Sequence, residues 1–154
     1  MSGERTRQNG ANNTMKRIES NVKQIPYSQE SVYAKVSDLS NLRDLIDRIP
    51  EKDRKINATD FVCTPDSVSC SVPPVGKVEI AIASREPYKC VKMETVSSPI
   101  RLIMWIQIVG LTDSTCKIKI TVDADLNAFM AKMVEKPLTE AVDKLADALA
   151  SVPY

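Results

Sequence analysis

The sequence contains no histidine, and this absence excludes several kinds of chemistry. Ser-His-Asp and Cys-His catalysis, histidine-ligated metal sites and histidine-ligated haem all require an imidazole. No other side chain has an unperturbed pKa near 7. An enzyme made from this chain would therefore depend on carboxylates, lysine, tyrosine or cysteine for proton transfer.

Glycine is also scarce, with four residues in the whole chain. Only Gly76 and Gly110 lie beyond the N-terminal segment, and neither belongs to a GxGxxG or GKT pattern. Phosphate-binding loops need glycines at such spacings, because the backbone must approach the phosphates closely. Nucleotide-dependent chemistry is therefore disfavoured, and we expect no cofactor.

Long hydrophobic runs are missing as well, since the longest spans residues 102–106. A helix that crosses a bilayer needs about 20 apolar residues, and a secretory signal needs an apolar stretch that this N-terminus lacks. We therefore predict a cytoplasmic protein without integral membrane association.

The chain has no large excess of positive or negative charge, with 21 Lys and Arg against 20 Asp and Glu. Arg5 and Arg7 against Glu4 give the first 14 residues a net charge of +1, which leaves zero for residues 15–154. A neutral domain with one Trp, two Phe and four Tyr lacks the basic electrostatic footprint typical of nucleic-acid binding. We expect no nucleic-acid partner.

The four cysteines show no CxxC spacing, so the sequence predicts reduced thiols that act as small buried hydrophobic residues. Cys63 and Cys70 flank a predicted turn at 65–67 and are expected opposite each other in a hairpin if its loop holds two or four residues. The alternative interpretation of this pair is a redox-sensitive or soft-metal site, although we expect no metal.

Residues 1–14 hold almost no apolar side chains and are rich in Asn, Arg and Gly, so burial cannot offset the entropy lost on ordering. We predict a disordered tail over 1–14 and a single domain over 15–154. Met15 directly precedes the first alternating segment and is an alternative start, which would make the tail an upstream extension.

Alternating apolar and polar residues predict a first strand over 16–25, which Pro26 ends. Ser28 is the expected N-cap of a short helix that runs to about residue 39. A second short helix is predicted from Ser40 to Pro50 on the spacing of its apolar residues. Two short helices between a first strand and the rest of a sheet is an uncommon order, and it is informative about the fold.

Six further strands are predicted, over residues 56–64, 68–72, 77–86, 88–97, 100–109 and 116–124. The last alternates most clearly, which is typical of an antiparallel sheet covered on one face. Residues 100–109 are apolar at both parities, so either Trp105 and Gln107 or Met104 and Ile106 face inward.

A long amphipathic helix is predicted from residue 127 to about 151, with Asn127 or Asp125 as its cap. At ~1.5 Å per residue it reaches ~37 Å, enough to cross a whole sheet. Pro137 removes one backbone donor and predicts a bend near residues 133–137.

Three segments carry a resemblance to a known family: IPYSQESVYAKVSDLSNL (25–42), PVGKVEI (74–80) and DADLNAFMAKMVEKPLTEAVDKLADALA (123–150). Together with the order of elements over 15–154, they resemble the polyketide cyclase and START-like (SRPBCC) superfamily. The resemblance implies a helix-grip α+β fold, in which a curved antiparallel sheet of about seven strands wraps around the C-terminal helix. It further implies an apolar cavity for lipids, sterols, quinones, polyketides or hormones. The segments encode capping and packing and contain no catalytic signature.

If this cavity exists, strand alternation and helical spacing select its ligand-binding side chains. The expected lining is Ile80, Ile82, Val91, Met93, Ile118, Ile120, Met130, Met133, Val134 and Leu138. The three methionines among them are flexible and polarizable enough to adapt to an irregular ligand. The alternative is that these side chains simply fill a solid core.

Ser84 and Glu86 form the polar pair that strand parity places on the inner face. Burial raises the pKa of a carboxyl group, so Glu86 is a weak candidate for a general acid or for a ligand anchor. It also precedes Pro87 at the strand end, and this position favours an exposed carboxylate over a buried one.

We therefore expect a protein that binds or transports a small hydrophobic molecule between sheet and helix. One alternative is a cyclase- or aromatase-like enzyme in which Glu86 moves protons. The other is a protein-interaction module with a filled core.

Overall fold

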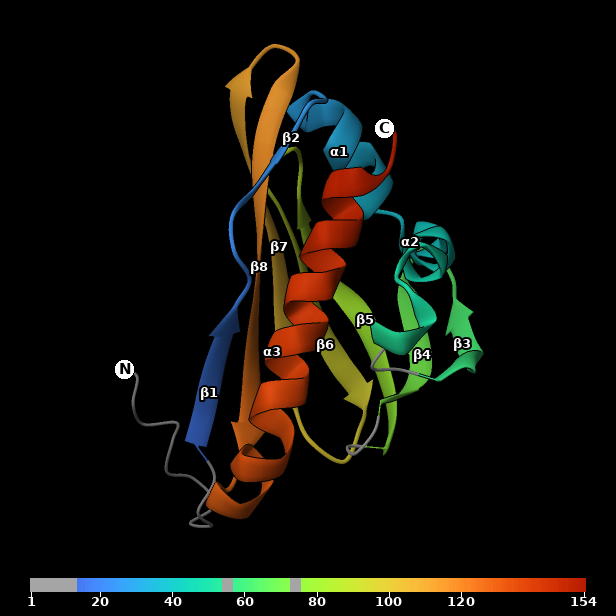
Figure 1. Ribbon diagram of the computed structural model, residues 1–154, viewed down its shortest axis with the longest axis vertical. Coiled ribbons are helices and arrows are strands. Elements are labelled where there is room, and N and C mark those ends of the chain that lie inside the picture. The colour runs from blue at the N-terminus through green and yellow to red at the C-terminus, as the bar shows by residue number, and fades with distance from the viewer. Residues whose placement is uncertain (1–13, 54–56, 73–75) are drawn as a thin grey trace.

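The computed structural model describes residues 14–53, 57–72 and 76–154 of the chain. A long, curved antiparallel sheet forms one layer, and the long helix α3 crosses its concave face (Figure 1). The described strands are β1 Thr14–Glu19, β2 Lys23–Ile25, β3 Asn57–Cys63, β4 Ser67–Val72, β5 Gly76–Glu86, β6 Cys90–Ser97, β7 Leu102–Thr112 and β8 Thr115–Leu126. The described helices are α1 Gln29–Val36, α2 Leu42–Arg48 and α3 Ala128–Ser151, with short 3-10 turns η2 Leu39–Asn41 and η3 Glu51–Asp53. The helix-grip α+β architecture expected from the sequence is confirmed.

The strands follow the order β1-β8-β7-β6-β5-β4-β3, and β2 also pairs with β8. The described sheet has eight strands where about seven were expected, because the predicted strand 16–25 is divided into β1 and β2. At the break, Ser20 N donates to Ile120 O at 2.8 Å, and Ile120 N donates to Ser20 Oγ at 2.9 Å. The hydroxyl replaces a backbone acceptor, and the pairing with β8 shifts by one residue between Glu19 and Lys23.

Side-chain capping explains where α1 and α3 begin. The Ser28 hydroxyl accepts from Ser31 N at 3.1 Å and starts α1, as the sequence predicts. Asn127 Oδ1 accepts from Met130 N at 2.7 Å and starts α3. The helix continues through Pro137 to Ser151, and the bend expected there stays a prediction.

The pairing of β7 with β8 decides which face of β7 points inward. Ile106 lies opposite the buried Ile120 and Met104 lies opposite Val122, and directly paired residues share a face of the sheet. Met104 and Ile106 therefore face α3. Trp105 lies on the outer face, with the Arg17 guanidinium 5.5 Å from its ring centroid.

The expected pairing of Cys63 with Cys70 in the hairpin of β3 and β4 is wrong. Cys63 lies opposite Val68, while Cys70 lies opposite Val78 of β5. The turn closes with Thr64 N donating to Ser67 O at 2.8 Å, and the partner of Cys63 is therefore residue 68 and not residue 70. All four cysteines carry free thiols.

Two expectations fall wholly or partly outside the described residues. The tail predicted over 1–14 is described only at Thr14, the first residue of β1. The turn predicted at 73–76 is described only at Gly76, whose φ of 112° suits glycine. Among the helices that the structure describes, none is long and apolar enough to cross a membrane.

Candidate functional site

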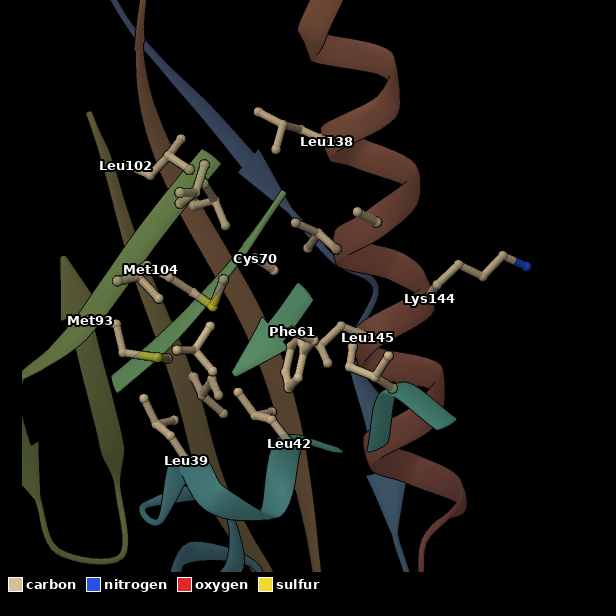
Figure 2. Close-up of a pocket in the computed structure, with 18 of the residues that line it drawn as sticks. Leu39, Leu42, Phe61, Cys70, Met93, Leu102, Met104, Leu138, Lys144 and Leu145 are labelled. Carbon is tan, nitrogen blue, oxygen red and sulfur yellow. The ribbon is translucent and has the colours of Figure 1, made fainter. Parts of the chain in front are cut away.

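An apolar cavity of about 180 Å³ lies between the concave face of the sheet and the helices α2 and α3 (Figure 2). Its lining consists of Leu39, Leu42, Ile46, Ile49, Phe61, Val68, Cys70, Val78, Ile80, Met93, Leu102, Met104, Ile106, Val122, Leu138, Ala141, Val142, Lys144 and Leu145. These residues come from both ends of the chain and from five strands of the sheet besides β3. The cavity therefore exists only in the assembled fold.

The floor of the cavity follows from strand pairing. Met93 of β6 lies directly opposite Met104 of β7, and Cys70 of β4 lies opposite Val78 of β5. Paired residues project from the same face of a sheet, so their side chains form one continuous apolar surface. All of these side chains belong to the face that α3 covers.

The roof follows from helical spacing. Leu138, Ala141, Val142 and Leu145 are separated by three, four and seven positions along α3, so they share one face of the helix. Helix α2 adds Ile46 beside them. Ala141 contributes only a methyl group, and its small volume helps to leave the space unfilled.

The cavity is nearly free of polar surface. Burial raises the pKa of the Cys70 thiol to about 11, so this thiol is neutral near pH 7. Lys144 lines the cavity with its aliphatic chain, while its ammonium group points away from it (Figure 2). Within the described part of the chain, the lining thus presents no group that exchanges protons inside the cavity near neutral pH.

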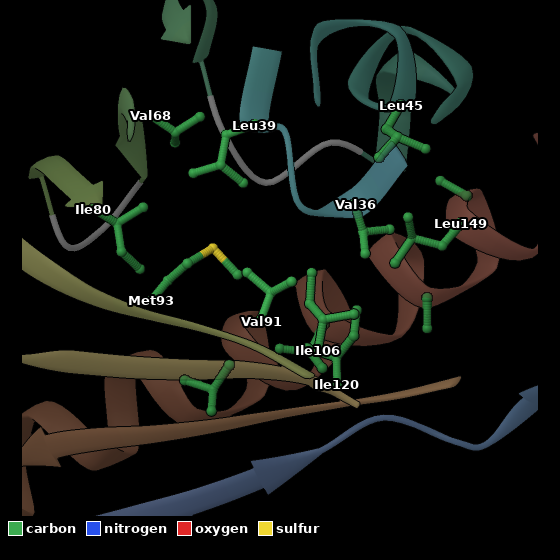
Figure 3. Close-up of a cluster of buried hydrophobic side chains, with 14 of the residues drawn as sticks. Val36, Leu39, Leu45, Val68, Ile80, Val91, Met93, Ile106, Ile120 and Leu149 are labelled. Atoms are coloured by element: carbon green, nitrogen blue, oxygen red, sulfur yellow. The ribbon is translucent and has the colours of Figure 1, made fainter. Parts of the chain in front are cut away.

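Three of the ten side chains expected at the ligand site, Ile80, Met93 and Leu138, line this cavity. Four others lie in the buried core instead: Val91, Ile118, Ile120 and Val134. In Figure 3, Val91 and Ile120 lie close to Ile106, which does line the cavity, whereas Val91 and Ile120 are fully buried without reaching it. The core is therefore packed in one part and hollow in another, a division that alternation along a strand cannot indicate.

The remaining three predicted residues also lie outside the cavity lining. Ile82 and Met130 are partly buried and pack against the core. The expected inward position of Met133 is wrong, because its side chain is 42% exposed near the start of α3. That end of the helix extends beyond the cavity.

The inward position that strand parity gave Ser84 and Glu86 is wrong, whereas the exposed carboxylate expected for Glu86 at the strand end is what the structure has. The pairing of β5 with β6 shifts between Ile82, opposite Met93, and Ser84, opposite Lys92. This bulge reverses the parity of the strand, so that Arg85 lies opposite the buried Val91 and Glu86 is exposed. The catalytic role considered for Glu86 has no support from its position.

Because of the bulge, Arg85 lies on the inner face of β5, opposite Val91. Its Nε donates to Ser37 O at 3.0 Å, and its Nη2 donates to Asp66 Oδ1 at 2.7 Å. The guanidinium therefore links the end of α1 to the turn between β3 and β4. Sequence reasoning missed this link, since a single arginine at a strand end carries no local signal.

Sequence reasoning also missed cavity residues of the helical segments and of β3, β4, β5, β7 and β8. Their helical spacing and alternation indicated burial, but burial alone does not separate a cavity wall from a filled core. The missed lining residues are Leu39, Leu42, Ile46, Ile49, Phe61, Val68, Cys70, Val78, Leu102, Met104, Ile106, Val122, Ala141, Val142, Lys144 and Leu145. Across residues 14–53, 57–72 and 76–154, no cluster of three or more cysteine or carboxylate side chains is placed to hold a metal ion.

No protein-family model matches the sequence, and a search of curated proteins finds no match. Solved structures of the same fold do match. Norcoclaurine synthase from Thalictrum flavum has a TM-score of 0.64 at 14% identity, over 95% of this chain and 100% of that one. A structure of that synthase with dopamine and hydroxybenzaldehyde has a TM-score of 0.63 at 13% identity, over 93% and 91% of the two chains. A START superfamily protein from Mycobacterium smegmatis has a TM-score of 0.65 at 15% identity, over 87% and 94%. This chain therefore has the START-like helix-grip fold.

Proposed function

We propose that this chain is a cytoplasmic protein that binds or carries a small apolar molecule in the cavity between the sheet, α2 and α3. The observation that carries the proposal is the apolar hollow of about 180 Å³ beside a cluster of buried side chains. Natural cores leave few voids larger than a water molecule, because each void forfeits packing contacts. A retained hollow of this size supports a binding role.

The volume limits the ligand to a compact molecule. An apolar protein cavity of about 150 Å³ binds benzene, whereas sites for drug-sized ligands span about 300–1,000 Å³. A ligand of one or two rings fits this range, while a long acyl chain would require the cavity to expand. Burial of apolar surface, at ~25 cal/mol per Å², supplies the affinity before entropic losses are subtracted.

An enzyme remains the second candidate, supported by the likeness to norcoclaurine synthase. Catalysis by proton transfer needs a titratable group beside the substrate. Glu86 lies on an exposed stretch, and the thiol of Cys70 is neutral. The site therefore favours binding over acid–base chemistry. The interaction module considered above required a filled core, and the cavity argues against that premise.

Titration with naphthalene tests the binding function, using two alanines of α3 as a matched pair. Ala141 lines the cavity, while Ala131 is partly buried against the core outside it. Ala141→Leu adds three carbons to the hollow and is expected to weaken naphthalene binding at least tenfold in isothermal titration calorimetry. Ala131→Leu makes the same change elsewhere on the helix and should leave the affinity near the wild-type value.

Native mass spectrometry of freshly purified protein provides an independent measurement. A co-purifying apolar mass that is present in the wild type and lost in Ala141→Leu supports the proposal. Equal affinities in the two leucine variants, or no binding of naphthalene, indole, cyclohexane or decanoic acid to the wild type, would contradict it.

A further inference from the structure

We infer that the cavity selects an uncharged aromatic ring system over a saturated ring system of similar size, and that Met93 and Met104 produce this preference. The inference depends on the binding function proposed above and names the class of ligand. It rests on the kind of atoms that line the floor of the hollow.

Sulfur atoms are concentrated on this floor. Met93 and Met104 lie opposite each other on β6 and β7, and Cys70 of β4 lines the same cavity. Figure 2 shows Met93, Met104 and Cys70 on the sheet side of the cavity, across from Leu138 and Leu145 of α3. Polarizable thioethers make favourable contacts with aromatic rings at about 5 Å, and a saturated ring offers no equivalent interaction.

The wall of the cavity also contains an aromatic side chain, that of Phe61. Phe61 of β3 lines the cavity and is 5% exposed. It is held in place from outside, since the Arg43 guanidinium lies 5.2 Å from its ring centroid and Arg43 Nη2 donates to Phe61 O at 3.0 Å. A fixed ring at the wall allows edge-to-face or offset contact with an aromatic ligand.

The same lining disfavours a charged ligand. An ionised carboxylate or ammonium buried without a partner carries a large desolvation penalty. The thiol of Cys70 is neutral, and the ammonium of Lys144 points away from the cavity. Fatty acids therefore fit poorly, both because of their head group and because of their length relative to a hollow of about 180 Å³.

Paired ligands separate the contribution of sulfur from that of shape. Naphthalene and decalin have the same carbon skeleton, one aromatic and one saturated, and both are titrated by calorimetry into each protein. The wild type is expected to bind naphthalene about two- to tenfold more tightly than decalin, relative to their partition into a hydrocarbon solvent. Replacing both thioethers by Met93→Leu and Met104→Leu keeps the volume nearly constant and should reduce this preference to the part that Phe61 contributes.

Met130→Leu is the matched control, because Met130 packs against the core outside the cavity lining. This variant should retain the wild-type preference, and thermal denaturation verifies that every variant is folded. Equal preference in the wild type and the double leucine variant would overturn the inference, as would tighter binding of decalin or of decanoic acid than of naphthalene. Those outcomes leave the binding function standing, whereas no binding of any of the three ligands contradicts the binding function itself.

Discussion

Two leucines on α3 provide a test of the cavity that needs no ligand. Leu138 lines the hollow and is 8% exposed, while Leu149 is fully buried at 0% exposure. Figure 3 shows Leu149 within the packed cluster, near Val36. Substitution of either leucine by alanine removes the same atoms from the same helix, so the transfer free energy of the deleted carbons is nearly equal. The difference in cost therefore reports the packing around each side chain.

The expected magnitudes follow from the number of contacts that each leucine loses. Leu→Ala in a packed core costs about 3 to 5 kcal/mol, and the cost rises with the volume of the void created. Leu149 has neighbours on all sides, so we expect about 5 kcal/mol for Leu149→Ala. One side of Leu138 already faces the hollow and makes no contacts there, so we expect about 3 kcal/mol for Leu138→Ala.

Urea denaturation of the two variants and the wild type measures these free energies of unfolding. A difference of about 2 kcal/mol corresponds to about 4–8 °C in melting temperature for a domain of this size. If Leu138→Ala costs as much as Leu149→Ala, or more, the space next to Leu138 is filled in solution. The reasoning about the cavity would then be refuted.

Four further predictions concern residues in and around the site. Burial raises the pKa of the Cys70 thiol from 9.0 to about 11. The contribution of the neutral thiol to the unfolding free energy is therefore complete below pH 9 and is lost as pH rises through 11. Between pH 8 and 11, the unfolding free energy of the wild type should fall by about 2 kcal/mol more than that of Cys70→Ala. A Cβ on Gly110 would lie 2.7 Å from Gln29 Oε1, so Gly110→Ala should displace Gln29 and destabilise the protein by about 1 kcal/mol, an effect absent in a Gln29→Ala background. Arg85→Ala should cost about 1 kcal/mol in urea denaturation, because it removes the hydrogen bonds that link α1 to the β3–β4 turn. Glu86→Gln should change the unfolding free energy by no more than about 0.5 kcal/mol and should leave the naphthalene affinity unchanged. A clear loss of affinity would show that Glu86 does act at the ligand site.

Local periodicity in the sequence predicted most of the strands and helices of the fold. Alternation in β8 and helical spacing in α3 each reflect the geometry of a single element, which repeats every 2.0 or 3.6 residues. These patterns were sufficient to predict the inward faces of Ile80, Met93 and Leu138. They failed at Glu86, because a bulge in β5 changes the parity, and the bulge is defined by pairing with β6.

The sequence by itself determined the elements, their order and the apolar faces that meet, since each depends on neighbouring residues along the chain. Only the tertiary structure decided where the interior is hollow. The curvature of the sheet and the positions of α2 and α3 combine side chains from Leu39 to Leu145 around one space. A void is a property of how distant surfaces fit together, and no periodicity within one segment encodes that fit.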